Sequence, residues 1–182
     1  MSIKTNFVFK VLQVVSWIIF VGLCIQAGGF IFNTFFTLLL NPVGASKFWH
    51  EVDLSALYYF NQSYFVTLTS LMIIVAVLKA VLFYEIVKIF HSKKFDLEQP
   101  FKDAIRKFIV IMANVAFGIG LFSAWGAGLN EYLITQGLKM PAVKDLSFGG
   151  ADVWLFMSII LLVIVQILKR GIAIQTENEL TI

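Results

Sequence analysis

The sequence has few charged residues, one cysteine, two histidines and three prolines, and these shortages exclude several classes of protein. Charged residues make up 14% of the 182 residues, whereas a soluble domain carries about 25%. The lone Cys24 excludes an intrachain disulfide and a cysteine metal cluster. Neither a nucleophile–base pair nor a convergent pair of acids occurs at a recognisable spacing. We therefore expect no cofactor, no metal centre and no enzymatic activity.

The residues that are abundant suit a lipid environment. Hydrophobic residues make up 59% of the chain and aromatic residues 15%, with 19 phenylalanines. One helical crossing needs about 20 mostly apolar residues, so this length permits four crossings and no sizeable soluble domain. The formal net charge of +3 follows a membrane topology and does not form a basic face on a polar fold. We therefore expect contact with membrane lipid and no direct contact with nucleic acid.

The long apolar segments predict an all-α fold, an integral membrane four-helix bundle that forms one transmembrane domain over residues 1–182. The first segment exceeds the thickness of a bilayer, and Gly28-Gly29 is the expected place for a bend. Lys169-Arg170 and the following Gly171 predict the end of the last helix. The four helices are expected at approximately 9–40, 64–90, 101–129 and 153–168.

Lysine and arginine are divided unevenly between the two ends of these helices. Lys47, Lys139 and Lys144 fall on one side. Loops on the cytoplasmic side of a membrane are enriched in these residues, so the richer side is predicted to be cytoplasmic, with both termini on it (N-in, C-in). The eleven basic residues on that side are Lys4, Lys10, Lys79, Lys88, Lys93, Lys94, Lys102, Arg106, Lys107, Lys169 and Arg170.

Small residues recur every fourth position in the third helix, at Ala116, Gly120, Ala124 and Gly128. Such a stripe lets another helix approach closely in lipid, within the bundle or from a second copy of the chain. A pore lined by small residues would need polar groups that this face lacks. We therefore interpret the stripe as a packing surface.

Lys79 is the one cation within an apolar run of the second helix. Its position predicts a side chain that extends toward the cytoplasmic headgroups. A transport site would more typically place an ionisable group near the bilayer centre with a partner. Glu85 and Lys88 are three residues apart and are expected to pair on one helix face.

Two motifs are typical of one bacterial family. The first is Phe90-His91-Ser92-Lys93-Lys94-Phe95 with Gln99-Pro100-Phe101 before the third helix. The second is Lys169-Arg170-Gly171 followed by the ending Glu177-Asn178-Glu179-Leu180-Thr181-Ile182. With these motifs the chain resembles the family called domain of unknown function 2975, small four-helix membrane proteins. It departs from the family in having Glu98-Gln99 where a glycine often precedes Pro-Phe.

The resemblance implies a location in the bacterial cytoplasmic (inner) membrane and a possible partner. Members are often encoded beside a small helix-turn-helix regulator of the repressor type, which implies a membrane partner that sequesters such a regulator. In the tail 171–182, Glu177 and Glu179 could pair with basic side chains of the regulator, while Leu180 and Ile182 supply apolar anchors. A tail folded back onto its own helix ends is an equally good interpretation.

Two other functions remain open from the sequence. The chain could be a structural or accessory subunit that binds other membrane protein subunits, since it has little mass outside the helices. A small-molecule transporter or binding protein is less favoured, because few polar groups lie within the apolar segments. The sequence does not decide whether the chain forms a homo-oligomer.

Overall fold

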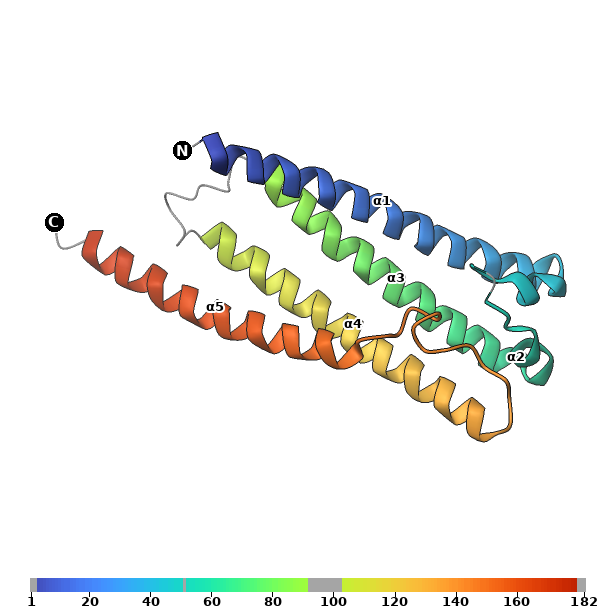
Figure 1. Ribbon diagram of the computed structural model, residues 1–182. Helices are drawn as coiled ribbons and strands as arrows, with labels where there is room; N and C mark the ends of the chain where they lie inside the picture. The colour runs from blue at the N-terminus through green and yellow to red at the C-terminus, as the bar shows by residue number, and fades with distance from the viewer. Residues whose placement is uncertain (1–2, 51, 92–102, 180–182) are drawn as a thin grey trace.

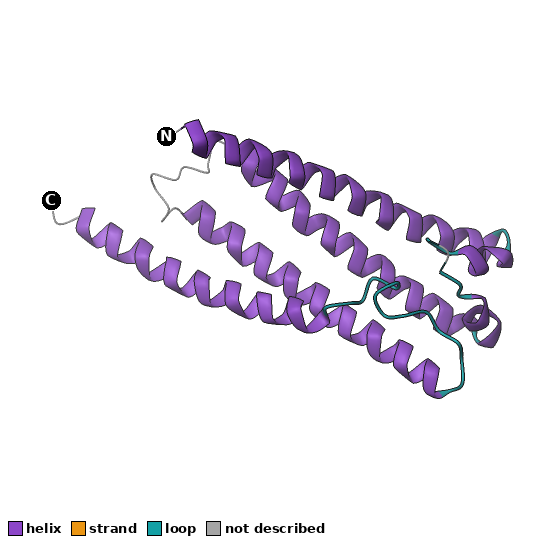
Figure 2. Ribbon diagram, viewed as in Figure 1, coloured by secondary structure: helices purple, strands orange, loops and turns teal. Residues whose placement is uncertain are grey.

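The computed structural model describes residues 3–50, 52–91 and 103–179, and every regular element in these ranges is a helix (Figure 2). Four of the helices are long and two are short. The long helices run side by side along the molecule (Figure 1). The elements are α1 (Ile3–Leu39), the 3₁₀ helix η1 (Pro42–Lys47), α2 (Ser55–Phe60), α3 (Gln62–His91), α4 (Asp103–Thr135) and α5 (Ala151–Glu179).

The four long helices form an open row, a looser arrangement than the four-helix bundle that the sequence predicts. Helix α1 packs on α3, α3 packs on α4, and α4 packs on α5. Within the described residues, α1 makes no helix contact with α4 or α5. Lipid is as apolar as the helix surfaces, so no hydrophobic driving force closes the row. The two outer helices consequently keep broad apolar faces exposed.

We name the two ends of the row by what they carry. The capped end carries η1, α2 and the loop 136–150 that joins α4 to α5. The open end carries the first residues of α1 and α4 and the last residues of α3 and α5 (Figure 1). Both chain termini therefore lie at the open end.

Short polar residues and a glycine divide the chain at the capped end. The Asn41 side chain accepts a hydrogen bond of 2.9 Å from the Val43 amide and begins η1. Asn61 has an extended backbone and accepts a 2.8 Å bond from the Ser63 amide, which separates α2 from α3. After α4, Gly137 has a φ of +85°, a left-handed conformation that glycine adopts without a steric penalty. These three positions create the loops that cap the row.

All four long helices are longer than expected, and two of them, α1 and α5, pass through glycines that were given another role. Helix α1 continues without interruption through Gly28-Gly29. Helix α5 continues past Lys169-Arg170-Gly171 to Glu179, so most of the expected tail is helical. Gly171 is not among the glycines with positive φ, so it does not form the left-handed cap that would end a helix. A glycine inside a helix costs only about 1 kcal/mol, which its neighbours can offset.

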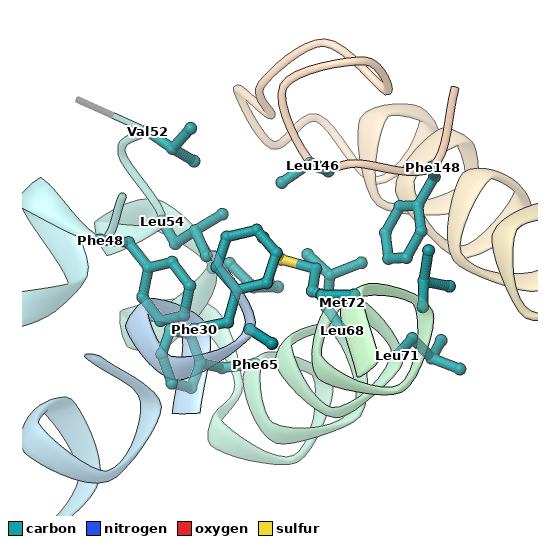
Figure 3. Close-up of a cluster of buried hydrophobic side chains, with 14 of the residues drawn as sticks. Phe30, Phe48, Val52, Leu54, Phe65, Leu68, Leu71, Met72, Leu146 and Phe148 are labelled. Atoms are coloured by element: carbon teal, nitrogen blue, oxygen red, sulfur yellow. The ribbon is translucent and has the colours of Figure 1, made fainter. Parts of the chain in front are cut away.

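The core lies at the capped end, where loops and helices meet (Figure 3). Phe30 of α1, Phe65 of α3 and Phe48 after η1 are fully buried there, with ring centroids about 6 Å apart. The loop 136–150 contributes Leu146 and Phe148, which are also buried. The remaining large side chains of this core that are fully buried are Leu54, Leu57, Leu68, Met72, Val75, Ile119 and Leu133.

Candidate functional site

A groove between α3 and α4 lies at the open end. Its apolar lining includes Ile89 of α3 and Ile105, Phe108 and Ile111 of α4. The cavity has a volume of about 260 Å³, somewhat below the range of typical ligand pockets, about 300–1,000 Å³. This volume suits one or two inserted apolar side chains better than a whole ligand. The full lining is Glu85, Lys88, Ile89, Ala104, Ile105, Lys107, Phe108 and Ile111.

Charged side chains surround this groove and pair along their own helices. Lys88 and Glu85 form the expected ion pair, with Nζ and Oε1 3.1 Å apart. On α4, Asp103 pairs with Arg106 at 2.6 Å and with Lys107 at 2.9 Å. Asp103 also lies in the first turn of α4, where a negative charge is favoured by the helix dipole. Ion pairs near the surface contribute little to stability, so the charged rim can exchange these partners for those of another molecule.

Helix α5 carries two of the four residues expected to dock a partner, Glu177 and Glu179. In Figure 1 its last turns extend beyond the first turn of α4. Ile174 is 59% exposed and Glu177 is also exposed. Glu179 is the last residue of the helix. Leu180 and Ile182 lie outside the described residues.

The small-residue stripe of α4 divides into two halves. Ala116 and Gly120 are buried, and Gly120 faces α5. A Cβ on Gly120 would lie 2.7 Å from Leu155 Cγ and 2.9 Å from the Leu155 backbone nitrogen. Ala124 and Gly128 are exposed, and nothing lies within 4 Å of a Cβ built on Gly128. The structure thus brings α5 against the first half of the stripe only.

The reason for this division is that α5 begins beside the middle of α4, not at its end. The loop 136–150 returns along the last turns of α4 before α5 starts (Figure 1). Gly126 faces the ring of Phe148 from that loop, too closely for any side chain at position 126. The loop therefore packs against a buried glycine that lies outside the four-residue repeat. The repeat alone gave no sign of this contact.

Lys79 does not extend toward the open end, so that expectation was wrong. Its ammonium donates a 2.9 Å hydrogen bond to the Ser147 carbonyl of the loop 136–150. The Gln26 amide of α1 donates a 2.8 Å bond to the Ser147 hydroxyl. Ser147 has a φ of +66°, which is costly for a residue with a Cβ. Two helices therefore hold one loop residue with a strained backbone. Its partners lie 68 and 121 positions away in the chain, so the local sequence gave no sign of these contacts.

Gly29 serves the packing of α1 against the segment that follows η1. Any side chain at position 29 would occupy the space of the Trp49 indole ring. The same ring lies against Phe30, with centroids 6.0 Å apart. By contrast, a Cβ at Gly28 would meet nothing within 4 Å. Of the glycine pair, only Gly29 must lack a side chain so that the Trp49 ring can pack against α1.

Four of the described helices are long and apolar enough to cross a membrane, and they define the chain as a helical membrane protein. The segments are Phe7–Leu39, Gln62–His91, Asp103–Thr135 and Ala151–Gln175. The sequence matches the family described as "Protein of unknown function (DUF2975)" over residues 49–182, and the chain belongs to this family. The resemblance drawn from the two motifs is thereby confirmed. No curated protein and no solved structure matches the chain.

Proposed function

We propose that this chain is a docking protein of the bacterial inner membrane that holds a small helix-turn-helix regulator at the cytoplasmic face. The observation that carries the proposal is the continuation of α5 beyond Arg170. A helix presents its side chains at fixed positions, whereas a flexible tail must first be ordered at an entropic cost. Ile174 and Glu177 are three residues apart, so one face of this extension offers an apolar and an acidic group together.

The topology that this proposal needs is N-in, C-in. The support is the uneven distribution of lysine and arginine between the two ends of the helices. With the open end in the cytoplasm, the groove between α3 and α4 and the extension of α5 are both accessible to a soluble partner. The groove could receive apolar side chains of that partner, and its charged rim could pair with polar ones.

Sequestration follows from competition for the same basic groups. A DNA-binding helix carries Lys and Arg side chains that contact phosphates. Carboxylates at Glu177 and Glu179 would occupy these side chains, so docking at the membrane and binding to DNA would exclude each other. The choice of a helix-turn-helix regulator as partner rests on the family to which the chain belongs, and this mechanism requires no catalytic group.

The docking role is tested with two charge variants of α5 in the full chain. We expect Glu177→Gln together with Glu179→Gln to reduce co-purification of a co-expressed helix-turn-helix regulator, of the kind often encoded beside members of the family, by at least about tenfold, as for losing charge-assisted bonds. Asp152→Asn is the control, because Asp152 lies in the first turn of α5, at the opposite end of this helix from the extension. Equal recovery of the regulator with the double variant and the control would contradict docking by the extension.

The topology is tested separately by cysteine labelling. In a Cys24→Ser background, His91→Cys should react with a membrane-impermeant maleimide only after the cells are opened. Lys47→Cys should react in intact cells. Labelling of position 91 from outside would overturn the orientation, whatever the result for the regulator.

A second function, as an accessory subunit of a larger membrane complex, is favoured by the open row. In the most apolar stretch of each helix, 6% of the residues are buried in α1 and 11% in α5. The corresponding shares are 28% in α4 and 44% in α3. Outer helices with so little buried surface could pack against another membrane protein. Purification in a mild detergent, followed by native mass measurement, should then show a stable larger assembly, and a single chain would contradict this role.

A further inference from the structure

A second cavity lies at the capped end, between the segment after η1 and the loop 136–150. Its volume is about 460 Å³, within the range of small-molecule pockets, about 300–1,000 Å³. One wall carries His50 and Asp53, and the other carries Lys139 and Asp145. Val52, Ala56, Met140 and Pro141 supply apolar surface between these groups.

The charged groups of this cavity face a common space without neutralising one another. Within the described residues, no ion pair joins Lys139 to Asp53 or Asp145. Asp53 uses its Oδ1 atom to accept bonds from the Ser55 amide at 2.8 Å and the Ser55 hydroxyl at 2.6 Å. These bonds, and more weakly the charge of Lys139, lower the pKa of Asp53, so its carboxylate is ionised at neutral pH.

The arrangement also argues against a metal ion. No group of three histidine, cysteine or acidic side chains is close enough to hold a metal within the described residues. The cavity itself offers two carboxylates, an imidazole and an ammonium on its two walls. A larger ligand with separated charges would match them better.

We propose that this cavity binds a small zwitterion, an amino acid or a similar compound that carries both an ammonium and a carboxylate. The ligand ammonium would lie against Asp53 and Asp145, and its carboxylate would lie against Lys139. Each contact is a charge-assisted hydrogen bond, the kind that contributes most to orienting a polar ligand. The apolar wall at Val52 and Met140 would contact the rest of the molecule.

Because the two walls belong to different segments of the chain, binding of such a ligand would affect the structure. Asp145 is two residues before Ser147, whose carbonyl and hydroxyl are held by Lys79 of α3 and Gln26 of α1. A ligand that bridges Asp53 and Asp145 therefore connects the segment before α2 to a loop that is anchored inside the helix row. Binding should raise the stability of the capped end by mass action.

The test uses the full chain in detergent and the twenty free L-amino acids as probes. We expect at least one probe to raise the melting temperature, and isothermal titration then gives its Kd. Asp53→Asn keeps the Oδ1 acceptor for Ser55 but removes the charge, and Lys139→Gln removes the opposite charge. Each should weaken binding by at least about tenfold, the loss of one charge-assisted bond.

Control variants, and ligand derivatives in which one charge is blocked, make the test specific. Asp152→Asn and Lys144→Gln remove exposed charges at the same end, outside the lining of the cavity, and should leave the Kd unchanged. The N-acetyl and the amide derivatives of the best probe, which each lack one charge, should both fail to bind. The proposal is overturned if no amino acid shifts the melting temperature. Unchanged binding by the two cavity variants, or retained binding by either derivative, would overturn it as well.

Discussion

The capped end and the open end of this protein are built from the same four helices but are held together by different means. At the capped end, aromatic and aliphatic side chains from helices and loops are completely buried. Contacts at the open end include an edge-to-face pair between Phe9 and Phe90 and ion pairs along single helices, and no large side chain of the described residues is fully buried there. The largest fully buried side chains of the described residues lie at the capped end or, as for Val75 and Ile119, near the middle of the row. The difference shows that the loops, and not the long helices alone, create the core.

The physical reason lies in the solvent around each part. Between helices in lipid there is no hydrophobic driving force, so association depends on close packing and hydrogen bonds. Loops that return onto the helices add side chains from a second direction and exclude water from apolar surface. The capped end therefore has the features of a rigid core, while the open end has those of a region of lower local stability.

The largest expected difference comes from removing one aromatic ring at the capped end and one at the open end. Phe65→Ala leaves a cavity in the fully buried core and should lower the free energy of unfolding by about 3–5 kcal/mol. Phe9→Ala at the open end removes a half-buried ring in one aromatic contact and should cost about 1 kcal/mol. Unfolding in detergent, followed by circular dichroism, measures both. Equal losses would show that the two ends are equally well packed.

A second pair of variants sharpens the boundary between close packing and open surface along α4. Gly120→Leu places a side chain against the Leu155 backbone and should cost about 1–3 kcal/mol by overpacking. Gly128→Leu adds the same side chain where no atom lies within 4 Å, so stability should be unchanged or slightly higher. The same unfolding measurement compares them. A comparable loss at both positions would mean that another helix covers the second half of the stripe.

The third comparison concerns the anchoring of the loop 136–150. Lys79→Met keeps the aliphatic stem but removes the donor to Ser147, and should cost about 1.5–3 kcal/mol, as for a hydrogen bond to a charged group. Hydrogen exchange should become faster in this loop while the open end stays unchanged. Lys88→Met, which breaks the ion pair with Glu85 and the contact of the ammonium with the Tyr84 ring, should cost no more than about 1 kcal/mol. Unaltered exchange in the loop of the Lys79 variant would show that Ser147 is held by other contacts.

Much of the helix arrangement was readable from the sequence, because a membrane crossing needs a long apolar run whatever its neighbours are. The four runs appeared as four helices, although α5 continued through a glycine that was expected to end it. The Glu85–Lys88 pair was also predictable, since residues three apart meet on any helix. The docking residues of the tail were inferred from the family, and only Glu177 and Glu179 of them lie in the described part of α5.

The distinction between equivalent-looking residues was decided only by the tertiary structure. Gly28 and Gly29 are adjacent, yet only Gly29 faces an indole ring. Gly120 and Gly128 belong to one repeat, yet only Gly120 faces α5. Lys79 seemed directed to one end of its helix and is bound to a loop from the other. A sequence determines hydropathy and local turns, because these depend on neighbouring residues. The path of a returning loop depends on contacts between residues far apart in the chain. The same contacts decide which glycine, lysine or glutamine the loop packs against.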